Sequence, residues 1–577
     1  MKYRWEYKSS PEKHSVEKLA QSLFKKLDST RMKIASLLVQ RGITTFEQAK
    51  TFFRPSLEDL HNPFLMKDMQ KAIKRILQAI QNQEKILIYG DYDVDGTTSV
   101  ALLYSFISTI YDKVTTYIPD RYTEGYGVSF QGIDYAFDND ISLIITLDCG
   151  IKDNEKVLYA HKKGIDFIIC DHHNPSEELP KAVAILNPKQ KNCMYPYKEL
   201  CGCGVGFKLV QALVVVLELP SEMPFEYLDL VAVAIAADIV PITGENRILT
   251  YFGLQKINKN PSTPIDIFVQ NLKKSLTVTD LVFVIAPRIN AAGRMKHGML
   301  AVQLLIEKNH EKAKILASEL ENFNAQRKQF DEQITYEALQ QIIENQEEKR
   351  FTTVVFNPTW HKGVIGIVAS RLTETYYRPT LVFTQSGKVL AASARSVSGF
   401  DIYKALEQCS ELLIQFGGHK YAAGLTLLPE NYLLFKEKFE KIVSQSIDSK
   451  FLIPKIEIDT ELSLKEISSS FYSVIKQFAP FGPLNMTPIF LVRGVINKAS
   501  RQIGTDTSHL RLVITDANGS ITWEGIGFGL GNKLPLVQSG MPLDIVYSLD
   551  ENTWNGATFV QLRVRDIKLT ETQKTIR

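Results

Sequence analysis

Short apolar runs that alternate with amphipathic stretches dominate the chain between residues 85 and 188. The runs KILIYG (85–90), SLIITL (142–147) and DFIIC (166–170) are short and rich in isoleucine, whereas the stretch 96–109 has the length of a helix. Strands that are apolar on both faces and alternate with helices are typical of a parallel sheet. The pattern therefore predicts an α/β lobe built on such a sheet.

Polar groups follow these runs where the strands are expected to end. DYDVDG (91–96) follows the first run, DCG (148–150) the second and DHH (171–173) the third. Because ligands bind beyond the carboxyl ends of parallel strands, we expect the three groups to converge at one edge of the sheet. Asp238, after the apolar run VAVAIAA, is a further acid that needs a partner.

Each of these groups has other interpretations when it is taken alone. DYDVDG resembles the start of an EF-hand loop, but its twelfth position is Leu102 instead of the required glutamate. A cluster of helix N-caps or a solvated turn would also explain three acids, and a pair of histidines is often a feature of the surface. The convergence of the groups favours a metal site.

The rest of the chain has three further patterns. Helices dominate from about 204 to 310, and a long amphipathic stretch (310–346) then suggests a connector between two lobes. Its expected buried face consists of Leu316, Leu320, Phe323, Phe330 and Ile334. A second α/β unit begins near TTVVF (352–356), and about five short alternating strands in 455–577 predict a small OB-like barrel.

Composition and charge narrow the function classes. The 577 residues include 67 Lys and Arg against 64 Asp and Glu, a formal charge of +3, so any nucleic-acid surface must be local. Six cysteines are too few for a disulfide framework, and Cys193, Cys201 and Cys203 lack zinc-site spacing. The first 20 residues lack the apolar core of a signal peptide. We therefore expect a soluble cytoplasmic protein without a membrane partner.

The three polar groups and AADIVP (236–241), which contains Asp238, resemble in this order the four motifs of the DHH phosphoesterase superfamily. The segments IPDRYTEGYGV (118–128), CGCGVGFKL (201–209), RINAAGRM (288–295) and FGGHKYAAGLTL (416–427) are similar to those of its RecJ family of single-stranded-DNA-specific exonucleases. The region from 481 onwards resembles the OB-fold of that family. Any one of these segments alone would be weak evidence, whereas the joint match is specific.

The local patterns and the resemblance, which covers about residues 75–570, together predict five segments. They are an N-terminal helical segment (1–75) that would cap the catalytic lobe, a DHH catalytic domain (76–309), a connector helix (310–350), a DHH-associated α/β domain (351–450) and an OB-like β-barrel domain (451–577).

The resemblance also implies two divalent cations, about 3.5–4 Å apart, that clamp the scissile phosphate. Manganese is the usual ion of the family, and magnesium is the alternative. The implied metal ligands are Asp91, Asp93, Asp95, Asp148, His172 and Asp238. Asp148 would bridge the two ions and is therefore also counted among the catalytic residues. His173 would act on the scissile phosphate or on its leaving oxygen.

Further residues are expected to bind phosphate or nucleic acid. Arg294 would neutralise the scissile phosphate, because a guanidinium matches two phosphate oxygens. Arg121, Ser393 and Arg395 would hold the 5′-terminal phosphate. Gly417, Gly418 and His419 would face the same cleft.

The implied activity is 5′→3′ hydrolysis of single-stranded DNA to 5′-mononucleotides in DNA repair and recombination, by a monomer. A single-strand-binding protein or a helicase is a possible partner. The alternative is a DHH phosphoesterase acting on short oligonucleotides, cyclic dinucleotides or pyrophosphate. A binding protein with an inactive DHH site is a second rival, but it would be expected to lack some of the motif acids or histidines, all of which are present here.

Overall fold

The protein is described by a computed structural model that covers residues 3–272, 274–554 and 557–571. The first two and last six residues of the expected terminal segments lie outside this description. The chain divides into two compact units, one formed by Leu60–Pro454 and the other by Met1–Asp59 together with Lys455–Arg577.

The first lobe of the unit Leu60–Pro454 is built on a five-stranded sheet in the order β3-β2-β4-β5-β6. All of its pairings are parallel, which confirms the predicted sheet. Its strands are β2 (Lys85–Gly90), β3 (Val114–Tyr117), β4 (Ile141–Leu147), β5 (Asp166–Cys170) and β6 (Ala184–Leu186). Every residue of β2 after the first is buried, as expected of a strand covered on both faces.

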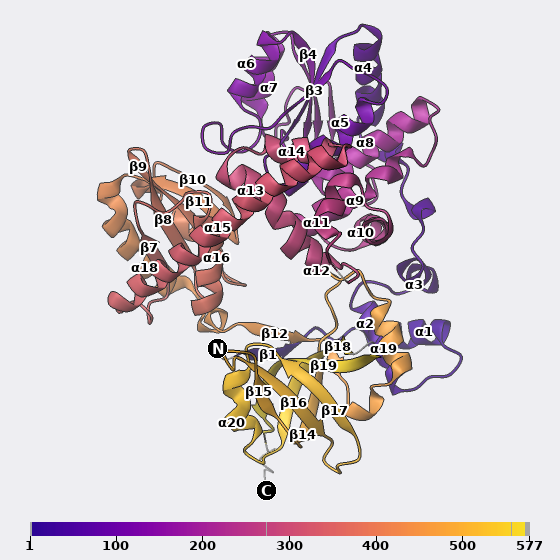
Figure 1. Ribbon diagram of the computed structural model, residues 1–577, viewed down its shortest axis with the longest axis vertical. Helices are drawn as coiled ribbons and strands as arrows, with labels where there is room; N and C mark the ends of the chain where they lie inside the picture. Colours follow the sequence, from indigo (N-terminus) through magenta and orange to yellow (C-terminus); the bar gives the residue numbers. More distant parts are fainter. Residues whose placement is uncertain (1–2, 273, 555–556, 572–577) are drawn as a thin grey trace. The chain divides into compact units, whose positions relative to one another are not determined.

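Helices cover this sheet and extend the lobe (Figure 1). Those that alternate with the strands are α4 (Met69–Gln81), α5 (Val94–Ile107), α6 (Phe130–Asp138), α7 (Asn154–Lys162) and α8 (Gly202–Val216). The helical part that follows contains α9 (Leu228–Ala237), α10 (Gly244–Lys259), α11 (Thr263–Val269), α12 (Val278–Asp280), α13 (Ala286–Met295) and α14 (Met299–Ile306).

The predicted connector is a single helix, α15 (His310–Glu344). Its buried face differs from the expected one. Phe330 is 39% exposed, whereas the buried stripe consists of Ala313, Ala317, Leu320, Asn324, Arg327, Asp331, Ile334, Ala338 and Ile342. The expectation was wrong about Phe330 because three polar residues occupy the middle of the buried stripe and hide its helical spacing from a hydrophobic pattern.

The second lobe is a smaller α/β unit with a five-stranded sheet in the order β10-β11-β9-β8-β7. Only β7 and β8 are parallel, so this sheet is mixed. Its elements are β7 (Thr353–Phe356), α16 (Ile365–Tyr376), β8 (Thr380–Ser386), β9 (Val389–Arg395), α17 (Ile402–Glu407), β10 (Gln415–His419), β11 (Ala422–Leu427) and α18 (Tyr432–Ser446).

The other unit contains a closed ring of strands, which confirms the predicted barrel. The sheet runs β13-β14-β18-β19-β17-β16-β15, and an additional pairing of β14 with β16 closes the ring. Its elements are β12 (Lys455–Ile458), β13 (Thr460–Glu461), α19 (Ser469–Lys476), β14 (Phe490–Asn497), β15 (Arg501–Ile503), β16 (His509–Thr515), β17 (Thr522–Gly527), α20 (Leu534–Val537), β18 (Leu543–Trp554) and β19 (Ala557–Leu569).

The N-terminal residues belong to this barrel unit, whereas we expected them to cap the catalytic lobe. Strand β1 (Arg4–Tyr7) pairs in parallel with β12. Helices α1 (Lys13–Leu23), α2 (Ser29–Val39) and α3 (Phe46–Phe53) share one hydrophobic core with the barrel strands. Residues 1–59 therefore have their apolar partners more than 400 positions away in the sequence, where no local pattern could reveal them.

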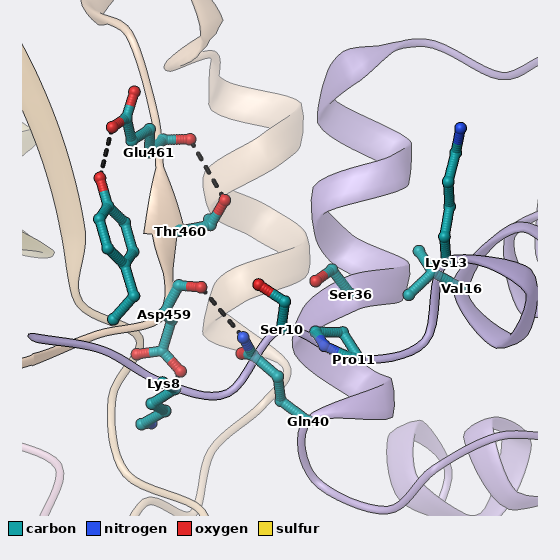
Figure 2. A pocket seen from close by; sticks show the side chains of 11 residues that line it. Lys8, Ser10, Pro11, Lys13, Val16, Ser36, Gln40, Asp459, Thr460 and Glu461 are labelled. Carbon is teal, nitrogen blue, oxygen red and sulfur yellow. Dashed lines mark hydrogen bonds and ion pairs between the residues drawn. The ribbon is translucent and has the colours of Figure 1, made fainter.

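Polar contacts join the same segments around a pocket of about 410 Å³. Gln40 donates a hydrogen bond to the backbone oxygen of Asp459 (3.0 Å), and the ammonium of Lys8 lies 2.8 Å from the Asp459 carboxylate (Figure 2). The pocket is lined by both lysines and carboxylates, so it lacks the single charge sign of an anion site.

Within the described ranges, we find no helix with the length and apolar character needed to cross a bilayer.

Candidate active site

The polar groups at the ends of β2, β4 and β5 do converge. The ladder of the sheet continues into them, because Asp148 N–H donates to the oxygen of Cys170 and Asp171 N–H donates to the oxygen of Leu186. Asp93 is the N-cap of α5, where its carboxylate accepts a hydrogen bond from Gly96 N–H at 3.0 Å. The acids are thus fixed by the strands and by the helix that leaves them.

The N-terminus of α8 is pressed against two of these acids. Both oxygens of Asp95 accept backbone hydrogen bonds, from Gly202 N–H at 2.6 Å and from Cys203 N–H at 2.8 Å. A Cβ atom at position 202 would lie 2.6 Å from the Cβ of Asp148, so only glycine permits this approach. In the sequence, this segment was noted only because it is similar to a segment of the RecJ family, and no role at the site was predicted for it.

Asp238 reaches the site from the C-terminal end of α9, where it is the C-cap. The next residue, Ile239, has φ = 58°, a left-handed conformation that a β-branched side chain rarely adopts. Asp148 has φ = 60°, a conformation that aspartate tolerates better. Strained backbone of this kind clusters at functional sites, where surrounding structure holds it in place.

His172 lies at the centre of the acids. Its Nε2 atom is 3.2 Å from Asp148, 3.5 Å from Asp238 and 3.8 Å from Asp95. The candidate ligand atoms form two groups, and within each group they lie within 4.8 Å of one another. One group is Asp148, His172 and His173, and the other is Asp95, His172 and Asp238. The structure thus brings together five of the residues predicted from the sequence.

Burial and mutual repulsion disfavour the charged forms of these groups. Burial raises the pKa of Asp95 to about 6 and that of Asp238 to about 8, and the charge of Asp93 adds to both shifts. The pKa values of Asp91 and Asp148 are raised well above the usual range for the same two reasons, burial first and neighbouring carboxylates second. Asp91 and Asp93 are therefore electrostatically part of the site, although neither belongs to the two close groups.

The donor set fits divalent cations. Burial lowers the pKa of His172 to about 3, which leaves a neutral imidazole that can bind a metal. Four side chains each have at least one buried polar atom without a hydrogen-bond partner among the described residues: Asp91, Asp148, His172 and Asp238. Carboxylate oxygens with an imidazole nitrogen suit manganese, and a pair of cations would satisfy both the orphaned atoms and the surplus negative charge.

His173 is oriented by Asp171, a motif residue that received no separate role from the sequence. Its Nδ1 atom lies 2.7 Å from Asp171, whose carboxylate also accepts backbone hydrogen bonds from Ile151 and His172. Burial alone would raise the pKa of Asp171, but the bonds from His173 and from the backbone lower it to about 2. Burial is the largest single influence on His173 and would lower its pKa. The hydrogen bond to Asp171, together with the charges of Asp171, Asp238 and Asp95, outweighs burial, so the pKa is raised.

Tyr126 is a further residue that the sequence reasoning did not assign. Its hydroxyl lies 3.2 Å from the Nε2 atom of His173. The flanking residues Gly125 and Gly127 have φ values of 86° and 81°, so the pair of glycines bends the loop over the site. The sequence Gly-Tyr-Gly at 125–127 was the local pattern that could have indicated such a turn.

A second pocket, of about 260 Å³, lies between the two lobes of the unit Leu60–Pro454 and adjoins the DYDVDG loop through Tyr92. Its cationic side chains are Arg121, Arg294, Lys362 and Arg395, and no carboxylate is found among the described residues that line it. Burial lowers the pKa of Arg294 to about 9, with Arg121 and Arg395 as the next causes. Because these positive side chains repel one another, the pocket is suited to bind a negatively charged group. We refer to this cavity as the arginine pocket.

The arginine pocket gathers some of the expected phosphate binders and not others. Arg121, Ser393 and Arg395 line it together with Arg294, which we had expected at the scissile phosphate. Gly417, Gly418 and His419 do not line it, because they form β10, which is separated from β9 by β11. Lys362 and the glycines at 363 and 366 line it although the sequence reasoning passed over them.

The raised pKa values predict how metal-free stability depends on pH. A carboxyl whose pKa is higher in the folded state stabilises the fold below the unfolded pKa of about 4, and this contribution is lost as pH rises through the folded pKa. For Asp95 and Asp238 the loss should therefore extend to about pH 6 and about pH 8. Thermal unfolding in a chelator should show falling stability over this interval, and Asp238→Asn should reduce the fall.

Manganese should reverse this trend, because bound cations replace the missing positive charge. At 100 times its dissociation constant, one bound cation would add about 2.7 kcal/mol to the free energy of unfolding. The gain in melting temperature on adding Mn²⁺ should be larger at pH 8 than at pH 6. A metal-free stability that rises with pH over this interval would contradict the assigned cluster.

Three family models match successive parts of the chain. They describe the DHH family, N-terminal domain (residues 85–235), the DHHA1 domain (residues 348–445) and the RecJ OB domain (residues 458–566). The first contains the candidate metal ligands up to His172, and the second contains Ser393 and Arg395.

Complete proteins are similar to the chain over almost its whole length. The single-stranded-DNA-specific exonuclease RecJ of Bacillus subtilis (strain 168) is 35% identical over 577 residues, which cover 99% of this chain and 72% of that protein. The crystal structure of RecJ from Thermus thermophilus in complex with Mn²⁺ has a TM-score of 0.83 at 25% identity and covers 99% of this chain and 80% of its own. The crystal structure of the same protein in complex with Mg²⁺ has a TM-score of 0.76 at 24% identity and covers 99% of this chain and 79% of its own.

Proposed function

Because the chain belongs to the RecJ family of single-stranded-DNA-specific exonucleases, we propose that it degrades single-stranded DNA from the 5′ end and releases 5′-mononucleotides. The observation that carries this proposal is the position of the arginine pocket beside the acidic cluster. Tyr92, which lines the pocket, follows directly on Asp91 in the chain. A strand whose 5′ phosphate occupies the pocket would place its next phosphodiester near the cluster.

The cofactor is a divalent cation, and we propose Mn²⁺ in preference to Mg²⁺. The proposed ligands are Asp91, Asp93, Asp95, Asp148, His172 and Asp238, and the presence of an imidazole among them supports manganese. When bound, such cations lower the pKa of water and neutralise charge on the phosphate.

The side chains of the chain itself supply orientation and a proton. We assign to Asp171 the task of holding His173 with Nδ1–H bonded to it, so that Nε2, which has the Tyr126 hydroxyl as its neighbour, is the atom that would act on the substrate. In hydrolysis, water adds to phosphorus and the bond to the 3′ oxygen of the terminal nucleotide breaks. His173 would donate the proton that this oxygen requires, and its raised pKa favours the protonated form.

The arginine pocket is proposed to hold the 5′-terminal phosphate. Arg121, Arg294 and Arg395 would share its charge, and Ser393 would donate a hydrogen bond. Duplex would have to open before its 5′ end could reach a pocket of this size.

The direct test of the proposed function compares substrates. The unmodified protein with Mn²⁺ is expected to release mononucleotides from a labelled 5′-phosphorylated oligonucleotide and to act poorly on pyrophosphate and on a cyclic dinucleotide. Preferred hydrolysis of either small substrate would favour the alternative among the DHH phosphoesterases.

The role of the pocket predicts that Arg395→Ala weakens recognition of the 5′ end more than it slows turnover. Losing one charge-assisted hydrogen bond to phosphate is worth about 1.5–3 kcal/mol, or about 10–100-fold in KM. The value of kcat at saturation should change little. Steady-state kinetics on 5′-phosphate and 5′-hydroxyl oligonucleotides measure both quantities.

Arg350→Ala is the matched control, because Arg350 lies in the same lobe and pairs with Glu437 at the surface. It should leave both parameters close to those of the unmodified protein. Equal KM values for the two kinds of end in the unmodified protein would remove the proposed role of Arg395.

A further inference from the structure

The connector helix α15 carries polar side chains in the middle of its buried face. Asn324, Arg327 and Asp331 are 1%, 9% and 0% exposed, and apolar residues of the same stripe lie on either side, such as Leu320 and Ile334. Replacing buried charges by apolar residues is often neutral or stabilising. Stability alone therefore gives no reason for a charged centre in this stripe.

Asp331 binds two arginines from two helices. One of its oxygens lies 2.8 Å from the guanidinium of Arg371 on α16 and 3.7 Å from that of Arg327 on α15. Arg327 in turn donates to the side-chain oxygen of Asn324 at 3.1 Å. Asp331 thus ties the connector to α16, a helix of the second lobe.

The start of α16 forms one wall of the arginine pocket. Ile365 and Gly366, the first two residues of the helix, line the pocket opposite Ser393 and Arg395. A Cβ atom at position 366 would lie 3.0 Å from the hydroxyl of Ser393 and 3.2 Å from the Nη2 atom of Arg395. The space between helix and strand is therefore set by the position of α16 to within a few tenths of an ångström.

The same stretch of α15 also lies close to the DHH side of the pocket. Met295, the neighbour of Arg294 in α13, packs against the core cluster that contains Ile334. Arg294 donates a hydrogen bond to the oxygen of Gly363 at 3.0 Å, just before α16 begins. The charge of Arg327 is among the causes that lower the pKa of Arg294, after burial, Arg121 and Arg395.

We propose that Asp331 is a positioning residue for selectivity toward a terminal phosphate. Through Arg371 it holds α16 on the connector, so that Gly366 stays against Ser393 and Arg395 and the pocket keeps the width of a phosphate monoester. The inference rests on the proposed function of the arginine pocket. The simpler role, attachment of a lobe to a helix, is already served on the same helix by Glu337, which accepts a hydrogen bond from the indole of Trp360 at 2.7 Å.

Asp331→Asn tests the proposal, because it keeps the shape of the side chain and removes its charge. Binding is measured by fluorescence anisotropy in a chelator, with oligonucleotides that carry either a 5′ phosphate or a 5′ hydroxyl and a label at the 3′ end. In the variant, the ratio of the dissociation constants for the 5′-hydroxyl and the 5′-phosphate oligonucleotide should fall about tenfold, which corresponds to the loss of one charge-assisted hydrogen bond. Gly366→Ala, which narrows the pocket directly, should lose preference as well.

Glu337→Gln is the matched control, since it weakens the same junction of connector and lobe without touching Asp331 or Arg371. It should lower the melting temperature and leave the preference unchanged. The proposal is overturned if Asp331→Asn keeps the preference, if Glu337→Gln loses it equally, or if the unmodified protein binds both ends alike. Failure of the proposed function would appear separately, as absence of hydrolysis by the unmodified protein with Mn²⁺.

Discussion

Asp148→Ala is expected to abolish hydrolysis of single-stranded DNA while leaving binding of the strand largely intact. Asp148 belongs to one of the two groups of candidate ligands and lies 3.2 Å from His172, the residue that both groups share. If Asp148 bridges two cations, as the family resemblance implies, its loss should reduce kcat at least about 10³-fold, or about 4 kcal/mol of transition-state stabilisation. Release of labelled mononucleotide measures the loss, and anisotropy with a 5′-phosphorylated oligonucleotide measures binding.

Unfolding would not explain such a loss. Because burial and neighbouring carboxylates raise the pKa of Asp148, its ionised form is unfavourable in the metal-free fold. Its removal should offset the cost of placing alanine at φ = 60°, so that the melting temperature in a chelator changes little. Asp134→Asn is the control, because Asp134 pairs with Lys163 at the surface of the same lobe and should retain full activity. Unchanged hydrolysis by Asp148→Ala would refute the two-metal assignment.

Lys208→Met is expected to have the largest effect on stability. Lys208 is fully buried in α8, and its ammonium lies 2.7 Å from Glu245 and 3.0 Å from the oxygen of His61. Glu245 also accepts a hydrogen bond of 2.6 Å from the hydroxyl of Tyr195. Removing one member of a buried pair leaves an uncompensated charge and costs about 3–5 kcal/mol.

A double-mutant cycle separates loss of charge balance from loss of packing. The variant Lys208→Met with Glu245→Gln should recover part of the stability, since no unpaired charge then stays buried. Lys314→Met, which removes an exposed partner of Glu311, should change the free energy of unfolding by less than about 0.5 kcal/mol. Denaturant titration of the unmodified protein, Lys208→Met, Glu245→Gln, the double variant and Lys314→Met measures these differences. Equal effects of Lys208→Met and Lys314→Met would contradict the argument from burial.

The parallel sheet and the acids at its edge could be predicted because both leave local marks in the sequence. Strands covered on both faces are continuous apolar runs, and the residues after them must lie at one edge. Asp95, Asp148, His172, His173 and Asp238 were brought together by this argument and by the family resemblance, and the structure places them within reach of one another.

Features that depend on distant partners could not be predicted in this way. The polar centre of α15 appears as an interruption of the apolar spacing, because Asp331 finds its partner Arg371 only in the folded protein. Likewise Tyr126 acquires its neighbour His173 through a glycine turn whose direction no local pattern specifies. Hydrophobic periodicity records which face is buried, but it does not record which charged groups meet there.

The joining of the two chain ends in one unit has a consequence for biosynthesis. Residues 1–59 leave the ribosome before Leu60–Pro454, yet the strands that complete their core are translated only after the whole of that unit. At about 5–20 residues per second, roughly 20–80 s separate the two events. Throughout this delay the apolar faces of α1 and α2 lack their partners, so a nascent chain of this protein should be a client of chaperones that shield exposed hydrophobic segments, while its catalytic unit can already fold.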